Sequence, residues 1–148
     1  MKGIAQEIRT AVQDTAKVLP TLNREEIAFK KSPASWSKKE ILGHLIDSAA
    51  NNHQRFVRAV YGAALDYPTY NQNEWVRIQR YNDSPWESLI TLWSAYNLHL
   101  SDLIERIPEE AKLSPCNIGK KAPVTLEFIV RDYLRHLRHH IEQILTPF

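Results

Sequence analysis

Apolar residues recur along this chain at the three- and four-residue spacing of amphipathic helices, in four separate segments. The first predicted helix covers residues 3–19, where Ile4, Ile8 and Val12 fall near one side and Pro20 ends the pattern. Because the signal for strands is weak throughout, the pattern predicts an all-α protein.

The second predicted helix begins at a capping box. The Ser37 side chain can cap the helix while Glu40 reaches back, and Trp36 and Ile41 stand where a hydrophobic staple would fix the entry angle. The apolar stripe that follows runs to about Gly62. It consists of Ile41, Leu45, Ala49, Phe56 and Val60.

The third and fourth predicted helices complete the set. The third begins with Ser84 as cap, Pro85 at the first helical position and Glu87 at the third, and it ends before Pro108. The fourth begins near Thr125 and runs to about Leu145. Its expected buried stripe is Leu126, Val130, Tyr133, Leu137, Ile141 and Ile144.

The connection between the second and third helices is long for a loop between neighbouring helices. Residues 63–83 therefore predict a crossover, with a short helical turn near Asn73–Arg77. Four amphipathic helices without strands predict a helix bundle. The length of 148 residues predicts one domain over residues 1–148.

Composition and charge narrow the function classes. With 43% hydrophobic and 24% charged residues, the chain has the composition of a globular protein. The formal net charge is +2, and acidic residues lie between the basic ones, so no basic arm for nucleic acid or an anionic membrane is expected. The lone Cys116 and the absence of a signal-peptide pattern or a bilayer-length apolar run predict a cytoplasmic location.

Histidines carry the chemistry of the sequence. On a helical wheel His136 and His140 lie one turn apart on the inward side of the fourth helix, whereas His139 points towards solvent. Side chains four residues apart stand about 5–6 Å apart at Cβ, so the two imidazoles can converge on one metal ion. No glutamate follows His136, which excludes the HExxH protease motif. A third ligand must come from another helix.

Spacing alone leaves the third ligand open. His44 shares a polar stripe with Ser48, Asn51 and Arg55, and this stripe is either solvated or lines a wet cleft. His53 lies closer to the apolar arc of the same helix, so it is a fair rival. A histidine pair at this spacing also occurs as two surface or boundary residues, and metal binding is therefore a hypothesis at this point.

Three segments taken together resemble one known family. The run from Trp36 to Ser48, followed by Arg55-Phe56, resembles the second-helix signature of the DinB/YfiT-like family. The runs Tyr70–Trp75 and His136–Ile144 resemble its crossover and fourth-helix signatures. The resemblance covers most of the chain after about residue 30. It implies an up-down-down-up four-helix bundle, often a homodimer.

The resemblance also implies a metal site. In such a protein nickel or zinc is held by one histidine of the second helix and two of the fourth, here His44, His136 and His140, which selects His44 over His53. Similar proteins include thiol S-transferases, which use a low-molecular-weight thiol as co-substrate, and proteins labelled as metal-dependent hydrolases. Gly43 and Gln143 stand where close bacillithiol transferases tend to have, or can have, histidine, which leaves the thiol open.

The leading hypothesis is that a metal-bound thiolate attacks a small-molecule electrophile in detoxification. The alternatives are a metal-dependent hydrolase of a small amide or ester, with metal-bound water as nucleophile, and a non-catalytic stress-related binding bundle. Asp47, one turn after His44, is either an acceptor or proton handler behind the ligands or an exposed acid. Asn51, Gln72, Asn73 and Trp75 are candidate substrate-binding residues, although packing or surface roles also fit them.

Overall fold

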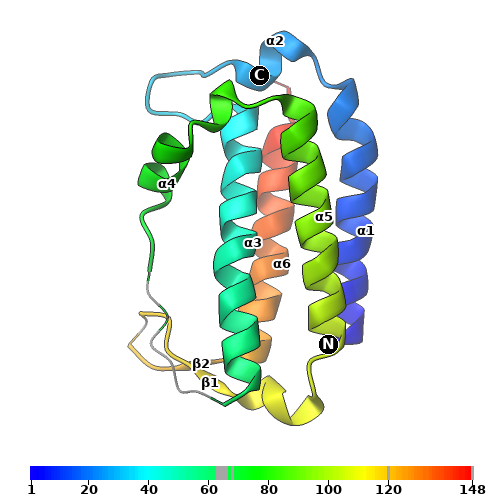
Figure 1. The fold of residues 1–148 in the computed structure, drawn as a ribbon, viewed down its shortest axis with the longest axis vertical. Coiled ribbons are helices and arrows are strands. Elements are labelled where there is room, and N and C mark those ends of the chain that lie inside the picture. The colour runs from blue at the N-terminus through cyan, green and yellow to red at the C-terminus, as the bar shows by residue number, and fades with distance from the viewer. Residues whose placement is uncertain (63–66, 68, 120, 148) are drawn as a thin grey trace.

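Four long helices run side by side in the computed structural model, which describes residues 1–62, 67, 69–119 and 121–147 (Figure 1). They are α1 (Lys2–Val18), α3 (Lys38–Val60), α5 (Trp86–Glu105) and α6 (Leu126–Leu145). In the view of Figure 1, α1 and α6 run upwards and α3 and α5 run downwards. The predicted all-α bundle with up-down-down-up order is therefore confirmed.

The long helices turn their apolar stripes to a shared core. On α6 all six residues of the expected stripe are buried, from Leu126 to Ile144. On α1, Ile4, Ile8 and Val12 face the same core, and Trp93 of α5 is fully buried. Each buried side chain of this size contributes about 1.5–3 kcal/mol relative to an exposed one, so the stripes that predicted the helices also hold them together.

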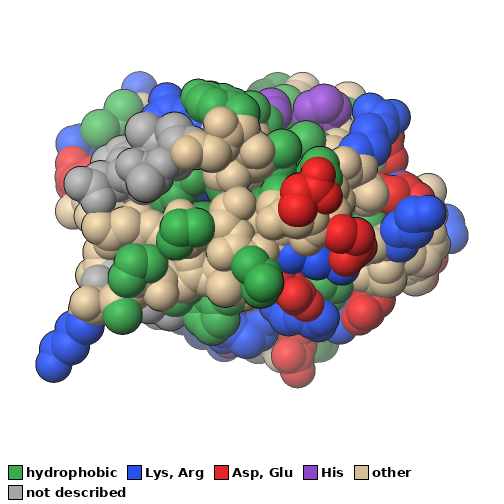
Figure 2. All heavy atoms as spheres, turned by 90° about the horizontal axis from the view of Figure 1, so that it is seen from below, with side chains coloured by type: hydrophobic (Ala, Val, Ile, Leu, Met, Phe, Trp, Pro, Cys, Tyr) green, Lys and Arg blue, Asp and Glu red, His purple; other side chains and the backbone are tan. Residues whose placement is uncertain are grey.

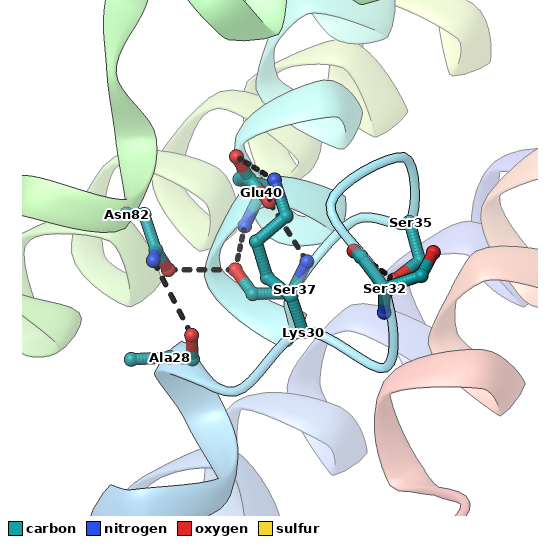
Figure 3. A network of polar contacts seen from close by, with 7 residues as sticks. All are labelled: Ala28, Lys30, Ser32, Ser35, Ser37, Glu40 and Asn82. Atoms are coloured by element: carbon teal, nitrogen blue, oxygen red, sulfur yellow. Dashed lines mark hydrogen bonds and ion pairs between the residues drawn. The ribbon is translucent and has the colours of Figure 1, made fainter.

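The predicted capping box forms at the start of α3, and it connects three segments (Figure 3). The Ser37 Oγ accepts a hydrogen bond from the Glu40 backbone N–H at 3.2 Å, while Glu40 Oε2 accepts from the Ser37 N–H at 2.9 Å. Ser37 Oγ also donates to Asn82 Oδ1 at 2.7 Å, and Asn82 Nδ2 donates to the Ala28 carbonyl at 3.3 Å. The cap thus fixes the end of the crossover beside the start of α3.

The predicted cap of the third helix is wrong. Pro85, with non-helical φ −60° and ψ 132°, occupies the N-cap position of α5, and no side chain caps this helix. The Ser84 carbonyl instead accepts a hydrogen bond from Lys39 Nζ at 2.7 Å, and Glu87 pairs with Arg24 at 2.9 Å. The Ser84 carbonyl and the Glu87 carboxylate therefore take part in tertiary contacts at the start of α5.

The shorter elements connect the bundle. Helix α4 (Gln72–Gln79) lies in the crossover beside α3, and it is longer than the predicted turn (Figure 1). Residues 63–66 and 68 of the predicted crossover lie outside the described residues. The sequence did not predict a group of very short elements. These are α2 (Arg24–Ala28), the antiparallel pair β1 (Pro115–Cys116) and β2 (Val124–Thr125), and the 3-10 turns Leu19–Thr21, Tyr81–Asp83 and Glu109–Leu113.

The surface carries charges of both signs. Figure 2, which looks at the end of the bundle where α3 finishes, shows acidic and basic side chains interspersed on that face. Many of these charges are paired along a helix: Arg131 binds Glu127 and Arg135 binds Asp132 at helical spacing. Among the described residues, no helix is both long and apolar enough to span a membrane.

Candidate metal centre

Three histidines from two helices meet where α3 packs against α6. His44 comes from α3, and His136 and His140 come from α6; one ring nitrogen of each lies within 4.8 Å of the others. The Nε2 atoms of His44 and His136 are 3.1 Å apart. Two nitrogens bound tetrahedrally to one zinc ion at 2.0–2.1 Å are about 3.3 Å apart, so this pair already stands near metal-binding separation.

The polar stripe of α3 faces inwards. His44 is fully buried, and Ser48, one turn further, is 4% exposed. His44 and Ser48 therefore lie in the contact with α6 and are not solvated, whereas Asn51 and Arg55, further along the stripe, are half-buried. His53, the rival candidate, lies apart from this cluster: its Nδ1 is 3.2 Å from the Tyr96 hydroxyl, and its ring packs against His99. The structure thus brings His44, and not His53, to the pair on α6.

Neighbouring side chains orient the imidazoles. His140 Nδ1 lies 2.8 Å from Gln143 Oε1, and this pairing makes Nδ1 the donor and leaves Nε2 free. Ser48 Oγ lies 3.4 Å from His136 Nδ1. The Trp36 ring packs 4.9 Å from the His44 ring. Contacts of this kind behind metal-binding histidines fix the tautomer and ring angle, so a set of three imidazoles here fits zinc or nickel.

Burial keeps the three rings neutral. It lowers the pKa of His44 to about 3, with a further contribution from the two other rings. Burial likewise lowers the pKa of His136 to about 4, and it lowers the pKa of His140, although the hydrogen bond to Gln143 opposes that shift. Metal ions bind the unprotonated imidazole. At neutral pH the cluster is therefore in its metal-binding form, and His44 Nδ1 is buried with no hydrogen-bond partner among the described residues.

Asp47 is buried and connects α3 to the crossover, which excludes the exposed-acid interpretation. The residue is only 3% exposed. Its Oδ1 accepts hydrogen bonds from the Tyr81 hydroxyl and from Gln79 Nε2, both at 2.6 Å. Burial raises the pKa of Asp47, while these two hydrogen bonds oppose the shift. Among the described residues Oδ2 has no partner, and the carboxylate makes no hydrogen bond to the three histidines.

Gly43 allows the crossover to approach α3. A Cβ atom built on Gly43 would lie 2.1 Å from Cδ2 of Tyr81, well inside contact distance. The Tyr81 ring therefore needs glycine beneath it in order to reach Asp47 with its hydroxyl. Sequence reasoning missed Tyr81 and Gln79, because no local pattern connects them to a carboxylate more than 30 positions earlier in the chain.

Two pockets border the histidines. One has a volume of about 580 Å³ and is lined by His140, Gln143 and Trp36 among others. The other has a volume of about 260 Å³ and is lined by His136 and Arg55 among others. The two sets of lining residues have no member in common. The cluster is thus reachable from two separate spaces.

The four candidate substrate-binding residues take different positions. Asn73 lines the larger pocket and Gln72 the smaller one. Trp75, which is 38% exposed, packs against the Tyr70 ring at 5.0 Å and lines a third, shallow pocket. Asn51 donates a hydrogen bond to the Asp47 carbonyl at 2.8 Å and lines neither pocket beside the histidines. The structure therefore brings Gln72 and Asn73, but not Asn51, to the walls of these two pockets.

Comparison with known proteins agrees with this architecture. Residues 7–144 match the family model of the DinB superfamily. A curated protein of Oceanobacillus iheyensis, named "Putative metal-dependent hydrolase", is 27% identical over 139 residues, which is 94% of this chain and 80% of that protein.

Two solved structures share the fold. YfiT from Bacillus subtilis, described as "a probable metal-dependent hydrolase with an unusual four-helix bundle topology", matches with a TM-score of 0.85 and 16% identity, over 96% of this chain and 82% of that one. A mycothiol-dependent maleylpyruvate isomerase matches with a TM-score of 0.77 and 14% identity, over 97% of this chain. This chain spans 60% of the isomerase. At these low sequence identities, the similarity to the two structures shows a shared fold and no more.

Proposed function

The chain belongs to the DinB superfamily, and on that premise we propose that it is a metal-dependent enzyme whose ion is held by His44, His136 and His140. The proposal is supported by the convergence of the three ring nitrogens within 4.8 Å and by the burial that keeps them neutral. A zinc or nickel ion with three imidazole ligands keeps a coordination position open, where it acidifies a thiol or a water molecule.

We propose thiol transfer as the reaction. A low-molecular-weight thiol loses its proton, its sulfur forms a bond to carbon of a small electrophile, and the proton leaves with the displaced group or is taken up by the adduct. The observation that carries this proposal is the pair of separate pockets, one bordered by His140 and one by His136. Two organic reactants need two spaces beside one reactive centre, whereas hydrolysis needs one such space and water.

The residues around the cluster have defined parts in this proposal. Gln143 and Ser48 hold the rings of His140 and His136 from behind, at 2.8 and 3.4 Å. The Trp36 ring covers His44 and limits the access of water to it. Asp47 acts through its bonds to Tyr81 and Gln79, which hold the crossover, and so the pocket walls that this segment supplies, against α3.

Hydrolysis of a small amide or ester is the second candidate, and it is supported by the descriptions of the Oceanobacillus and Bacillus proteins as metal-dependent hydrolases. A hydrolase also needs a group that accepts the proton of water. Asp132 is the one carboxylate among the described residues lining the smaller pocket, and its Oδ1 is 2.7 Å from Arg135. This carboxylate is thus already bound to a guanidinium, and we therefore place thiol transfer first.

A two-substrate assay separates the candidates. Protein purified without a histidine tag and loaded with zinc or nickel is incubated with a reactive electrophile, with and without thiol, and the S-conjugate is measured by mass spectrometry. We expect conjugate only when thiol and metal are both present, and we expect its loss in His136→Ala but not in His99→Ala. Ester or amide turnover without thiol would favour the hydrolase.

A non-catalytic binding bundle predicts a different result, because it needs no metal and its partner binding would survive His44→Ala or His136→Ala. The homodimer, the cytoplasmic location and the single domain over residues 1–148 stay predictions of the sequence.

A further inference from the structure

The smaller pocket contains a cation that has no acidic partner in the part of the chain that the structure describes. Arg55, on α3, lines this pocket together with His136. Among the described residues its side chain takes part in no hydrogen bond or ion pair, whereas Arg131 and Arg135, on the neighbouring face of α6, each bind a carboxylate. A half-buried guanidinium that is not paired has lost part of its hydration without gaining a charged partner. A bound anion would provide that partner.

The surroundings of Arg55 suit an anionic group. Ser48, Asn52, Gln72 and Tyr70 line the same pocket and offer neutral hydrogen-bonding groups. The acid in its wall, Asp132, is bound to Arg135. The positive charge of Arg55 also acts within the site, since it opposes the burial that raises the pKa of Tyr70 to about 12. The pocket thus has one uncompensated positive charge and several neutral donors.

We propose that Arg55 anchors a carboxylate of the substrate in this pocket, with the reacting part of the same molecule beside His136. A planar guanidinium binds a carboxylate through two parallel hydrogen bonds, and a single cation matches a single negative charge. The inference rests on the proposed function for the location of the reacting part, but the anion site itself depends only on Arg55 and its pocket.

The geometry also sets the length of the ligand. Ser48, which contacts His136, and Arg55 are seven residues apart on α3, which corresponds to about 10 Å along the helix. Side chains of a helix lean towards its N-terminus, so Arg55 leans towards Ser48 and covers part of that distance. A carboxylate several bonds away from the reacting atom therefore fits better than one directly beside it.

The first experiment uses metal-free protein and butyrate, with butyramide as the neutral analogue of the same shape. Binding is followed by NMR shifts of the Arg55 side chain and of the Ser48 and Asn52 amides. We expect saturable shifts with butyrate and none with butyramide. The affinity for butyrate should fall at least about tenfold in Arg55→Gln, which removes the charge-assisted hydrogen bonds, and less in Arg55→Lys, which keeps the charge.

The matched control is Arg58→Gln, which removes an arginine one turn further along α3 that does not line this pocket. It should leave butyrate binding unchanged. Equal binding of butyrate to the wild type and to Arg55→Gln, or equal binding of butyrate and butyramide, would overturn the inference.

A second experiment identifies which reactant carries the carboxylate. Zinc-loaded protein is titrated with 6-mercaptohexanoate and with 6-mercaptohexanol, and we expect at least a fivefold preference for the acid that disappears in Arg55→Gln. Butyrate binding that depends on Arg55, without any preference between the two thiols, places the carboxylate on the electrophile instead. Failure to bind zinc would refute the proposed function, and the butyrate titration would still decide the role of Arg55.

Discussion

Helix α3 carries two histidine clusters that differ in almost everything except residue type. His44 meets two histidines of α6, is fully buried, and has its Nε2 3.1 Å from the Nε2 of His136. His53, nine positions later, meets Tyr96 and His99 of α5 on a half-exposed face, where its ring centroid is 5.3 Å from that of His99. Both clusters include a histidine of the same helix, but α6 adds two histidines to the first whereas α5 adds one histidine and a tyrosine to the second, so the partner helix decides which cluster suits a metal.

The electrostatic difference follows from the same packing. Burial lowers the pKa of both His44 and His53, but only around His44 do two further rings converge from one neighbouring helix with their nitrogens together. His44 also buries its other ring nitrogen, Nδ1, which has no hydrogen-bond partner among the described residues, and such a buried group is costly. The following predictions test this contrast, beginning with the largest expected effect.

Removal of one ring from each cluster gives the sharpest contrast. His136→Ala should lower metal affinity at least about 100-fold, because two imidazoles rarely hold a divalent ion where three did. His99→Ala should leave the metal content at the wild-type value. Elemental analysis of both variants, purified without a histidine tag, measures this, and equal metal content in the two would contradict the assignment of the site.

Beside His44, the crossover packs closely against α3 through the contact of Tyr81 with Gly43. Gly43→Ala places a Cβ 2.1 Å from the Tyr81 ring, and we expect it to lower the free energy of unfolding by about 3 kcal/mol through overpacking. Gly3→Ala is the matched control, because its Cβ would meet nothing within 4 Å and alanine favours the helix. Urea unfolding of the two variants gives the comparison. A neutral Gly43→Ala would show that Tyr81 moves aside freely.

The pH dependence of stability should separate the clusters. Since the folded-state pKa values of His44 and His136 are about 3 and about 4, the unfolded chain takes up protons first as the pH falls below about 6.5. Metal-free protein should therefore be most stable above that pH and lose on the order of 2 kcal/mol for each of these two histidines between pH 7 and pH 5. Urea unfolding measures the loss, which should shrink in His44→Phe much more than in His53→Phe.

The smallest expected effect concerns Gln143, the side chain that orients the His140 ring. Gln143→Ala removes the acceptor that faces His140 Nδ1 at 2.8 Å, and we expect metal affinity to fall about tenfold. The corresponding change in the second cluster, Tyr96→Phe, removes the hydroxyl beside His53 and should not alter metal affinity. Competition with a chelator measures both. An unchanged affinity in Gln143→Ala would mean that backbone geometry alone orients His140.

The sequence predicted the long helices and the pair on α6 because both depend on local spacing. The capping box at Ser37 and the inward side of His136 follow from rules that involve one turn of helix. The start of α5 was predicted wrongly for a physical reason: the Ser84 carbonyl is bound by Lys39, a contact across 45 positions that no local rule contains.

The rest of the site depends on contacts that periodicity cannot report. A hydrophobic stripe identifies one buried face, but α3 also buries a polar face with His44, Asp47 and Ser48 because α6 and the crossover cover it. Spacing therefore left His44 and His53 as rivals, and the family resemblance selected the one that the structure brings to α6. The short α2 and the two-residue strands are too short for a hydrophobic periodicity to be recognised in the sequence.

The first turn of α4 has a consequence for how relatives of this protein can diverge. Gln72 and Asn73 are consecutive, yet they border different pockets, so this turn acts as a partition between two chambers. A small rotation or a changed side chain there would enlarge one chamber while it narrows the other. Reactant preference could thus be retuned in evolution by a segment that contributes none of the three imidazoles.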